Sequence, residues 1–179
     1  KAASVTLVTI NGGPFIYTGS AIEPATVSVT GAGGLNETPA AAYVNNINVG
    51  TATASYTYAG DANHYGSNDS EDFAIGKAST TTTVVATNAT YDGNQHGATA
   101  SVTGDGGLSE SLTVTYEGVA PTVYASSAVA PVNAGTYKAS ASYSGDANHD
   151  GSSDSKNFTI DKAASVTLVT INGGPFIYT

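Results

Sequence analysis

Apolar and polar residues alternate along two segments of the chain. In residues 135–143 (GTYKASASY), Tyr and Ala occupy every second position, and Lys and Ser stand between them. Residues 50–58 (GTATASYTY) repeat the pattern, with Ala52, Ala54, Tyr56 and Tyr58 on one side. A period of two places one face of a β-strand in the core and the other in water. Both segments are therefore predicted to be half-buried strands.

Further short strands are predicted between turns rich in Gly, Pro and Asn. Asn11-Gly12-Gly13 is a hairpin-type turn signal, because Asn and Gly tolerate positive φ. Many short strands with frequent turns are typical of a β-sandwich. We expect an all-β fold of seven or so strands per domain, with almost no helix. The remaining strand candidates are residues 4–10, 26–30, 40–44, 73–75, 80–86, 98–103, 112–116 and 158–160.

Two internal repeats set the organisation of the chain. Residues 162–179 (KAASVTLVTINGGPFIYT) are identical to residues 1–18, which predicts a 161-residue repeat in the parent protein. Within that period, residues 50–78 and 135–163 share 18 identities in 29 positions. We therefore expect two domains, residues 1–76 and 77–161, followed by residues 162–179 as the first strands of a third. The chain is expected to be a soluble, internal segment of a longer precursor.

The connections between these predicted domains are short. The strand at residues 73–75 runs through Gly76 and Lys77 into the next domain, and residues 158–160 run likewise through Asp161 and Lys162. No flexible Gly/Ser-rich or Pro-rich linker intervenes. The expected architecture is tandem immunoglobulin-like β-sandwich domains stacked end to end, with the neighbouring repeats of the same chain as partners.

The charge of the chain limits its partners. The formal net charge is −9, and the five basic residues are all lysine. Phosphate backbones and anionic lipids both attract clustered Lys and Arg, so neither nucleic acid nor membrane insertion is expected. No apolar run approaches the ~20 residues that span a bilayer. The absence of cysteine excludes disulfides and thiol chemistry.

No catalytic constellation is predicted, and the chain is not expected to be an enzyme. A nucleophilic triad needs a histidine base oriented by a carboxylate. Two of the three histidines, His64 and His149, occupy the same repeated G-D-A-N-H turn, whereas His96 stands elsewhere. Repetition in both domains favours a role in the turn. We therefore name no catalytic and no cofactor-binding residue, and expect no cofactor.

Calcium is the strongest alternative. Residues 146–154 place oxygen-bearing side chains at loop positions 1, 3, 5 and 9 and Gly151 at position 6, as in the first half of a calcium loop. The required Glu at position 12 is replaced by Asn157, and Tyr65 removes the fifth-position carboxylate in the other copy. The competing interpretation is that Asp and Asn side chains bond their own backbone as Asx turns. No metal ligand is therefore assigned. The oxygen-bearing residues are Asp146, Asn148, Asp150 and Asp154, which correspond to Asp61, Asn63, Tyr65 and Asp69.

Covalent modification is not predicted either. The four Asn-x-Ser/Thr sequons are about as many as the composition gives by chance, and nothing makes a Lys, an Asn and an acid neighbours for an isopeptide bond. The sequons begin at Asn36, Asn68, Asn88 and Asn157.

Residues 133–139 (NAGTYKA) resemble the D-x-G-x-Y-x-C stretch of immunoglobulin strand F, in which the tyrosine hydroxyl bonds back to the backbone. Tyr137 is the corner candidate, and Ala139 stands in the place of the disulfide cysteine. Ala52 replaces the tyrosine in the first domain, so the corner is expected to be absent or rebuilt there.

Both domains also carry an ordered set of motifs: YTG or YDG near the start, SVTG-x-GGL in the middle, and GT-x-x-A-S with GDANH and GS near the end. With this set they resemble the bacterial immunoglobulin-like repeats called MBG or YDG-type domains. The resemblance covers essentially the whole chain. It implies a sandwich fold and a setting in large secreted or surface proteins, often adhesin-like, and it carries over no catalytic residue.

The expected function is that of a structural spacer or stalk in an extracellular bacterial adhesin or surface fibre. The alternatives are a self-assembling filament subunit joined by strand exchange, and a module that recognises glycan or mucin. Residues 162–179 bear on the filament, because without the rest of a third domain they are expected to be disordered or to lie along a neighbour's sheet. Their apolar residues, normally shielded in part, are Val166, Leu168, Ile171, Phe176 and Ile177.

Overall fold

The computed structural model describes residues 1–174 and 178. These residues are nearly all-β, as predicted, with fourteen strands, two three-residue 3₁₀ turns and no α-helix. None of the described residues forms a helix with the length and apolar character needed to cross a membrane. We call residues 1–76 the N-terminal half and residues 77–161 the C-terminal half. The N-terminal half contains β1 (Ser4–Ile10), β2 (Phe15–Ile16), β3 (Ala25–Gly31), η1 (Ala32–Gly34), β4 (Leu35–Glu37), β5 (Ala42–Val44), β6 (Gly50–Tyr58) and β7 (Ser67–Gly76). The C-terminal half contains β8 (Thr80–Ala86), β9 (Ala89–Thr90), β10 (Ala98–Gly104), η2 (Asp105–Gly107), β11 (Leu108–Ser111), β12 (Thr115–Gly118), β13 (Gly135–Tyr143) and β14 (Ser152–Asp161).

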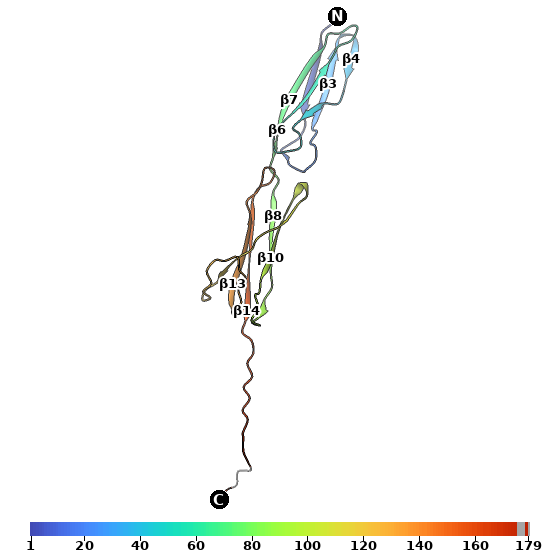
Figure 1. Ribbon diagram of the computed structural model, residues 1–179. Helices are drawn as coiled ribbons and strands as arrows, with labels where there is room; N and C mark the ends of the chain where they lie inside the picture. Colours follow the sequence, from blue (N-terminus) through green and yellow to red (C-terminus); the bar gives the residue numbers. More distant parts are fainter. Residues whose placement is uncertain (175–177, 179) are drawn as a thin grey trace.

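The two halves have the same sheet topology. In the N-terminal half, β1, β3 and β4 form one sheet in the order β1-β3-β4, and the other sheet has the order β2-β7-β6-β5. In the C-terminal half the corresponding orders are β8-β10-β11 and β9-β14-β13-β12. Among the described residues no sheet takes strands from both halves. Figure 1 shows the two sets of strands one after the other along an elongated molecule.

Each half has a hydrophobic core between its two sheets. The alternating strands β6 and β13 lie in the larger sheets, and their small or aromatic inner residues share a core with Val27 and Val29 of β3 and with Ala100 of β10. Ala54 and Ala139 are completely buried. Thr and Ser stand at the outward positions of the same strands, so the predicted alternation is confirmed. The arrangement is a two-layer β-sandwich in each half.

Strands β7 and β14 are much longer than predicted, because polar residues extend them. β7 pairs with β6 along nine positions, from Gly50–Ile75 to Tyr58–Ser67. Its polar part alternates as the apolar part does, with Ser67 and Asp69 facing β1. Ser67 Oγ lies 2.7 Å from Thr6 Oγ1, and Val8 N–H donates to Asp69 Oδ2 at 2.7 Å. Because these inward-facing side chains are polar, the pattern of hydrophobic residues does not predict this part of the strand.

The predicted strand at residues 112–116 is wrong in its position. The chain is paired at Leu108–Ser111 and again at Thr115–Gly118, and the predicted segment contains the break between β11 and β12. The predicted strand at residues 40–44 is confined to Ala42–Val44. Four short strands, β2, β4, β9 and β11, were not predicted, because segments of two to four residues show no periodicity.

The turn at Asn11-Gly12-Gly13 has the predicted positive φ at both glycines but does not form a hairpin. β1 pairs antiparallel with β3, whereas β2, after the turn, pairs parallel with β7 in the other sheet. The turn therefore moves the chain from one sheet to the other. The C-terminal half makes the same change between β8 and β9, which pairs parallel with β14.

The predicted tyrosine bond is present. The Tyr137 hydroxyl donates to the Asn133 carbonyl at 2.7 Å, and Tyr137 is buried. A second tyrosine bond, which was not predicted, occurs in both halves: Tyr43 Oη accepts from Ala25 N–H, and Tyr116 Oη from Ala98 N–H. The bonds of Tyr43 and Tyr116 tie a strand of the larger sheet to a strand of the smaller sheet in each half.

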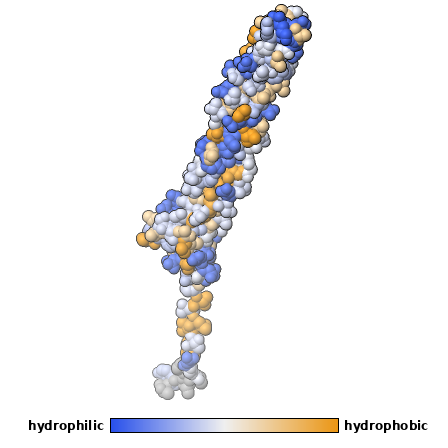
Figure 2. Space-filling model, turned by 45° about the horizontal axis from the view of Figure 1, so that its top comes forward, coloured by the Kyte–Doolittle hydropathy of each residue, from blue (hydrophilic) through white to orange (hydrophobic). Residues whose placement is uncertain are grey.

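Residues 162–174 form no strand and extend beyond the C-terminal half (Figure 1). Figure 2 shows hydrophobic residues exposed along this segment. Val166, Leu168 and Ile171 have exposed fractions of 94%, 86% and 78%. Phe176 and Ile177, expected to be shielded in the same way, lie outside the described residues.

Candidate functional site: the joint between the halves

The G-D-A-N-H turn has the same geometry in both halves. Asp146 Oδ1 accepts hydrogen bonds from the N–H groups of Asn148 and His149, at 2.8 and 2.7 Å. Asp61 Oδ1 accepts the corresponding bonds from Asn63 and His64, both at 2.6 Å. These are the Asx turns of the competing interpretation. The aspartate at the first loop position therefore holds the turn through its own backbone.

The histidine of each turn is buried and bonded at both ring nitrogens. His149 Nδ1 lies 2.9 Å from Asp146 Oδ1, and Nε2 lies 2.8 Å from the Asp105 carbonyl. A neutral imidazole has one N–H donor, whereas both partners here are acceptors. The arrangement therefore favours the imidazolium form. His64 is held in the same way, between Asp61 and the Ala32 carbonyl.

The pKa values of the histidine and the aspartate in each turn are shifted in the directions that favour the charged pair. The hydrogen bond to the Asp105 carbonyl, and then the bond to Asp146, raise the pKa of His149. The pKa of His64 is raised by the Ala32 carbonyl and Asp61. The pKa values of Asp146 and Asp61 are lowered, first by the bond from the histidine and further by backbone N–H donors. Each pair is a charge-assisted clamp between the turn and the 3₁₀ turn η2 or η1.

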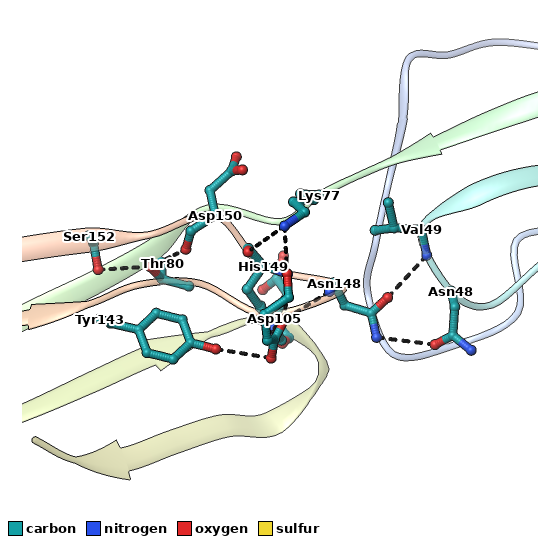
Figure 3. Close-up of polar contacts among 11 residues, drawn as sticks. Asn48, Val49, Lys77, Thr80, Asp105, Tyr143, Asn148, His149, Asp150 and Ser152 are labelled. Atoms are coloured by element: carbon teal, nitrogen blue, oxygen red, sulfur yellow. Dashed lines mark hydrogen bonds and ion pairs between the residues drawn. The ribbon is translucent and has the colours of Figure 1, made fainter.

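The residues of the calcium-loop pattern do not converge on one point. The Asp154 carboxylate turns to β8 and accepts from Val84 N–H at 2.8 Å, while the Asp146 carboxylate is taken up by the turn. Asp150 lies exposed at the side of the turn (Figure 3). Among residues 1–174 and 178, no three His, Cys, Asp or Glu side chains form a group suited to a metal ion.

Asn148 reaches from the turn to the N-terminal half, which the sequence did not predict. Its Oδ1 accepts from Val49 N–H at 3.1 Å, and its Nδ2 donates to Asn48 Oδ1 at 3.2 Å. Figure 3 shows this side chain pointing away from its own turn towards the loop of Asn48 and Val49. One amide thus connects residues about a hundred positions apart in the sequence.

Two further contacts complete the joint. The rings of Tyr17 and His149 meet edge to face, with centroids 5.3 Å apart and an interplanar angle of 85°. Gly19 and Gly106 approach so closely that a Cβ on Gly19 would stand 2.6 Å from Gly106 Cα. Both glycines also have positive φ. We define the joint as Tyr17, Gly19, Asn48 and Val49 against Gly106, Asn148 and His149.

The covalent connection at the joint is short, and hydrogen bonds to the turn hold it in place. β7 ends at Gly76, and Ala78 already forms a parallel bridge with His149. Ala78 N–H donates to the Asn148 carbonyl and its carbonyl accepts from Asp150 N–H, each at 2.9 Å. The Lys77 ammonium donates to the carbonyls of Asp146 and His149 (Figure 3). Lys77 is thus the single residue between two hydrogen-bonded segments.

The remaining candidates of the sequence lie outside the joint. His96 Nε2 is 3.0 Å from Asp92 Oδ1, without the geometry of a hydrogen bond. The four sequon asparagines are exposed, and Asn88 Oδ1 accepts from Thr159 N–H. One feature of the sequence could have pointed to the joint: Tyr17 and Asn148 belong to motifs that both halves share.

Comparison with models of known protein families gives no match for this chain, and comparison with curated proteins gives none either.

Proposed function

We propose that the chain is a structural spacer: immunoglobulin-like β-sandwich domains, residues 1–76 and 77–161, stacked end to end as part of a rod. The observation that carries the proposal is the joint, in which a single residue, Lys77, connects β7 to the bridged Ala78. A connection this short, with contacts on two sides of it, opposes both bending and swivelling. Strands of up to ten residues at ~3.3 Å each, plus loops, give each domain about 35–40 Å of length.

The proposed setting is an extracellular bacterial surface fibre or adhesin. Support comes from the MBG/YDG-type motifs, including Tyr91-Asp92-Gly93, and from a chain that is acidic and free of cysteine. A spacer also needs no reactive site, and the buried histidines His64 and His149 use both ring nitrogens within the fold. The proposed partners are neighbouring repeats of the same chain.

A flexible insertion tests the spacer. Four Gly/Ser residues placed between Gly76 and Lys77 remove the short connection but leave both halves intact. Small-angle scattering is expected to give a narrow distribution of maximum dimensions for the native chain and a broader one for the lengthened chain. If the native chain already shows the breadth of the lengthened chain, the spacer proposal fails.

A filament joined by strand exchange is the second candidate, favoured by the exposed segment at residues 162–174. Its apolar side chains and unpaired backbone offer an edge for pairing with another chain. A head-to-tail contact of this kind would propagate without closing. Sedimentation of chains ending at Asp161 and at Thr179, over a range of concentrations, separates the cases: association of only the longer chain supports the filament, and identical monomeric behaviour excludes it.

A further inference from the structure

The contacts of the joint have counterparts at the two outer ends of the molecule. The Tyr17 N–H donates to the Gly76 carbonyl, and Tyr91 N–H donates to the Asp161 carbonyl in the same way. Tyr91 and Gly93 therefore correspond to Tyr17 and Gly19. In the aligned repeats, Asn133 and Ala134 correspond to Asn48 and Val49. The C-terminal half thus carries, at its far end, the residues that correspond to the receiving side of the joint, with Ala134 in place of Val49.

The opposite end carries the matching turn. Asn63 and His64 correspond to Asn148 and His149, and Gly33 corresponds to Gly106. Gly33 has the same positive φ as Gly106, 74° against 71°, so the backbone shape is conserved between the halves. Asn63 is exposed, whereas Asn148, at the joint, is half-buried. The N-terminal end therefore presents the shape of the docked turn without a partner.

An apolar hollow lies where this turn would dock. It is lined by Tyr91, Ala134 and residues 162–165. Tyr91 is 42% exposed, whereas Tyr17 is half-buried against His149. No described residue accepts a hydrogen bond from Ala134 N–H, while the corresponding Val49 N–H is bound by Asn148. Tyr91 and Ala134 of the hollow thus correspond to Tyr17 and Val49, which lie on the receiving side of the joint.

The sequence of residues 162–165 identifies the occupant. Lys162-Ala163-Ala164-Ser165 is identical to residues 1–4, and Ala2 forms a parallel bridge with His64. Ala2 N–H donates to the Asn63 carbonyl, as Ala78 N–H does to the Asn148 carbonyl at the joint. Ala163 therefore has the sequence context to pair with a copy of Asn63 and His64. Asp161–Lys162 is as short a connection as Gly76–Lys77.

We propose that the hollow at Tyr91 and Ala134 is the receiving face of a second joint, and that its occupant is a further copy of residues 1–76 that begins at Lys162. Its Asn63 binds the Ala134 N–H, its His64 meets the ring of Tyr91, and its Gly33 packs against Gly93. The inference rests on the spacer function and deepens it, since it names the partner surface that continues the rod.

Charge differences favour this alternating order. Asp92 replaces Thr18 beside the receiving glycine, and the turn proposed to dock there has Ala32 and Tyr65 where the C-terminal half has Asp105 and Asp150. A second C-terminal half at this position would bring Asp105 towards Asp92, and like charges repel at short range. In the proposed joint, Asp92 on the receiving face would lie opposite the uncharged residues Ala32 and Tyr65 of the docking turn. The second joint discriminates between the two kinds of half.

The experiment uses a tandem chain in which Thr179 continues into Gly19 of a second copy. The native chain has no cysteine, so engineered pairs report without background. The test pair is Ala134→Cys in the first copy with Asn63→Cys in the second. Val49→Cys with Asn148→Cys in one copy is the benchmark for the observed joint. Ala134→Cys in the first copy with Asn48→Cys in the second is the control, because Asn48 lies at the other end of its half.

Disulfide formation in a glutathione buffer is expected at similar rates for the test and benchmark pairs. Both rates should exceed that of the control by about 100-fold, because held cysteines have a high effective concentration. Ala32→Asp with Tyr65→Asp in the second copy should slow the test pair several-fold at low salt and less at high salt. A test pair as slow as the control, beside a fast benchmark, overturns the second joint alone. A slow benchmark overturns the spacer function and this inference with it.

Discussion

The ring of Tyr17 meets the ring of His149 edge to face, 5.3 Å between centroids, at the boundary between the two halves. His149 is positioned for this contact by two bonds of its own, to Asp146 and to the Asp105 carbonyl. The same histidine therefore stabilises its turn and presents a ring to the neighbouring half. The turn motif and the joint are one structural unit.

Replacing Tyr17, whose side chain also packs against the core of the N-terminal half, with Ala should loosen the joint. An aromatic pair contributes about 0.5–1.5 kcal/mol beyond its buried area, so opening at Val49 should become easier by about that amount. Amide hydrogen exchange of Val49 measures the opening. Tyr91→Ala is the matched control, since Tyr91 lies at the outer end, and it should leave Val49 exchange unchanged. Equal effects of both substitutions would remove Tyr17 from the account.

The stability of the fold should depend on pH through the two Asp–His clamps. The raised pKa of His64 and His149 means that their contribution is complete below the unfolded value of about 6.5 and is lost as pH rises through the folded pKa. The lowered pKa of Asp61 and Asp146 means that their contribution is complete above about 3.9 and is lost as pH falls towards the folded pKa. The melting temperature should therefore be highest between about pH 4 and 6.5.

The double variant His64→Gln, His149→Gln checks the basic side of this profile. Glutamine keeps a donor but carries no proton that titrates, so the decline in melting temperature above neutral pH should flatten. Histidine Cε1–H shifts followed by NMR give the two pKa values directly. Values at or below the unfolded pKa would contradict the imidazolium assignment.

The parts of the fold that the sequence predicts are those encoded by local patterns of apolar and polar residues. The alternation in β6 and β13 is a local pattern, and it predicts the buried positions Ala54 and Ala139. The repeated motifs predict equal topology in the halves. The polar part of β7 was missed, because Ser67 and Asp69 face inward to bond β1. A hydrophobic pattern does not detect a buried polar interface.

The joint was missed for a different reason. The absence of a linker predicts a stiff connection, but the contact between Asn148 and Val49 joins residues far apart in the sequence. In a turn, an Asn is most simply explained by bonds to its own backbone. In this turn only Asp146 bonds the backbone of the turn with its side chain. The sequence therefore predicts that the halves lie next to one another, and not which side chains hold them.

Calcium should not stabilise the chain. The Asp146 carboxylate already accepts from Asn148, His149 and Tyr143, and ligation would break those bonds. A specific site would add about 2.7 kcal/mol at a hundredfold excess over Kd. The melting temperature after chelation should therefore be the same with and without millimolar calcium. A rise of several degrees would restore the calcium-loop interpretation.

Tyr137→Phe should destabilise the C-terminal half by about 1 kcal/mol, since it removes the bond from the hydroxyl to the Asn133 carbonyl inside the fold. Urea denaturation measures the change in the free energy of unfolding. Tyr91→Phe, at an exposed position, is the control and should change little. A loss below 0.3 kcal/mol, on the order of the error of such comparisons, would mean that water replaces the bond.

The stiffness of the joint is the central claim, and a distance between the halves tests it most directly. Spin labels on cysteines at Thr57 in β6 and Ser153 in β14 are both exposed, and they lie on opposite sides of the joint. Double electron–electron resonance should give one narrow distance distribution, which broadens when Tyr17→Ala and Asn148→Ala are combined. Tyr91→Ala with Asn63→Ala, the same changes at the outer ends, should leave it narrow. A distribution for the native chain as broad as that of the Tyr17→Ala, Asn148→Ala chain would contradict the account.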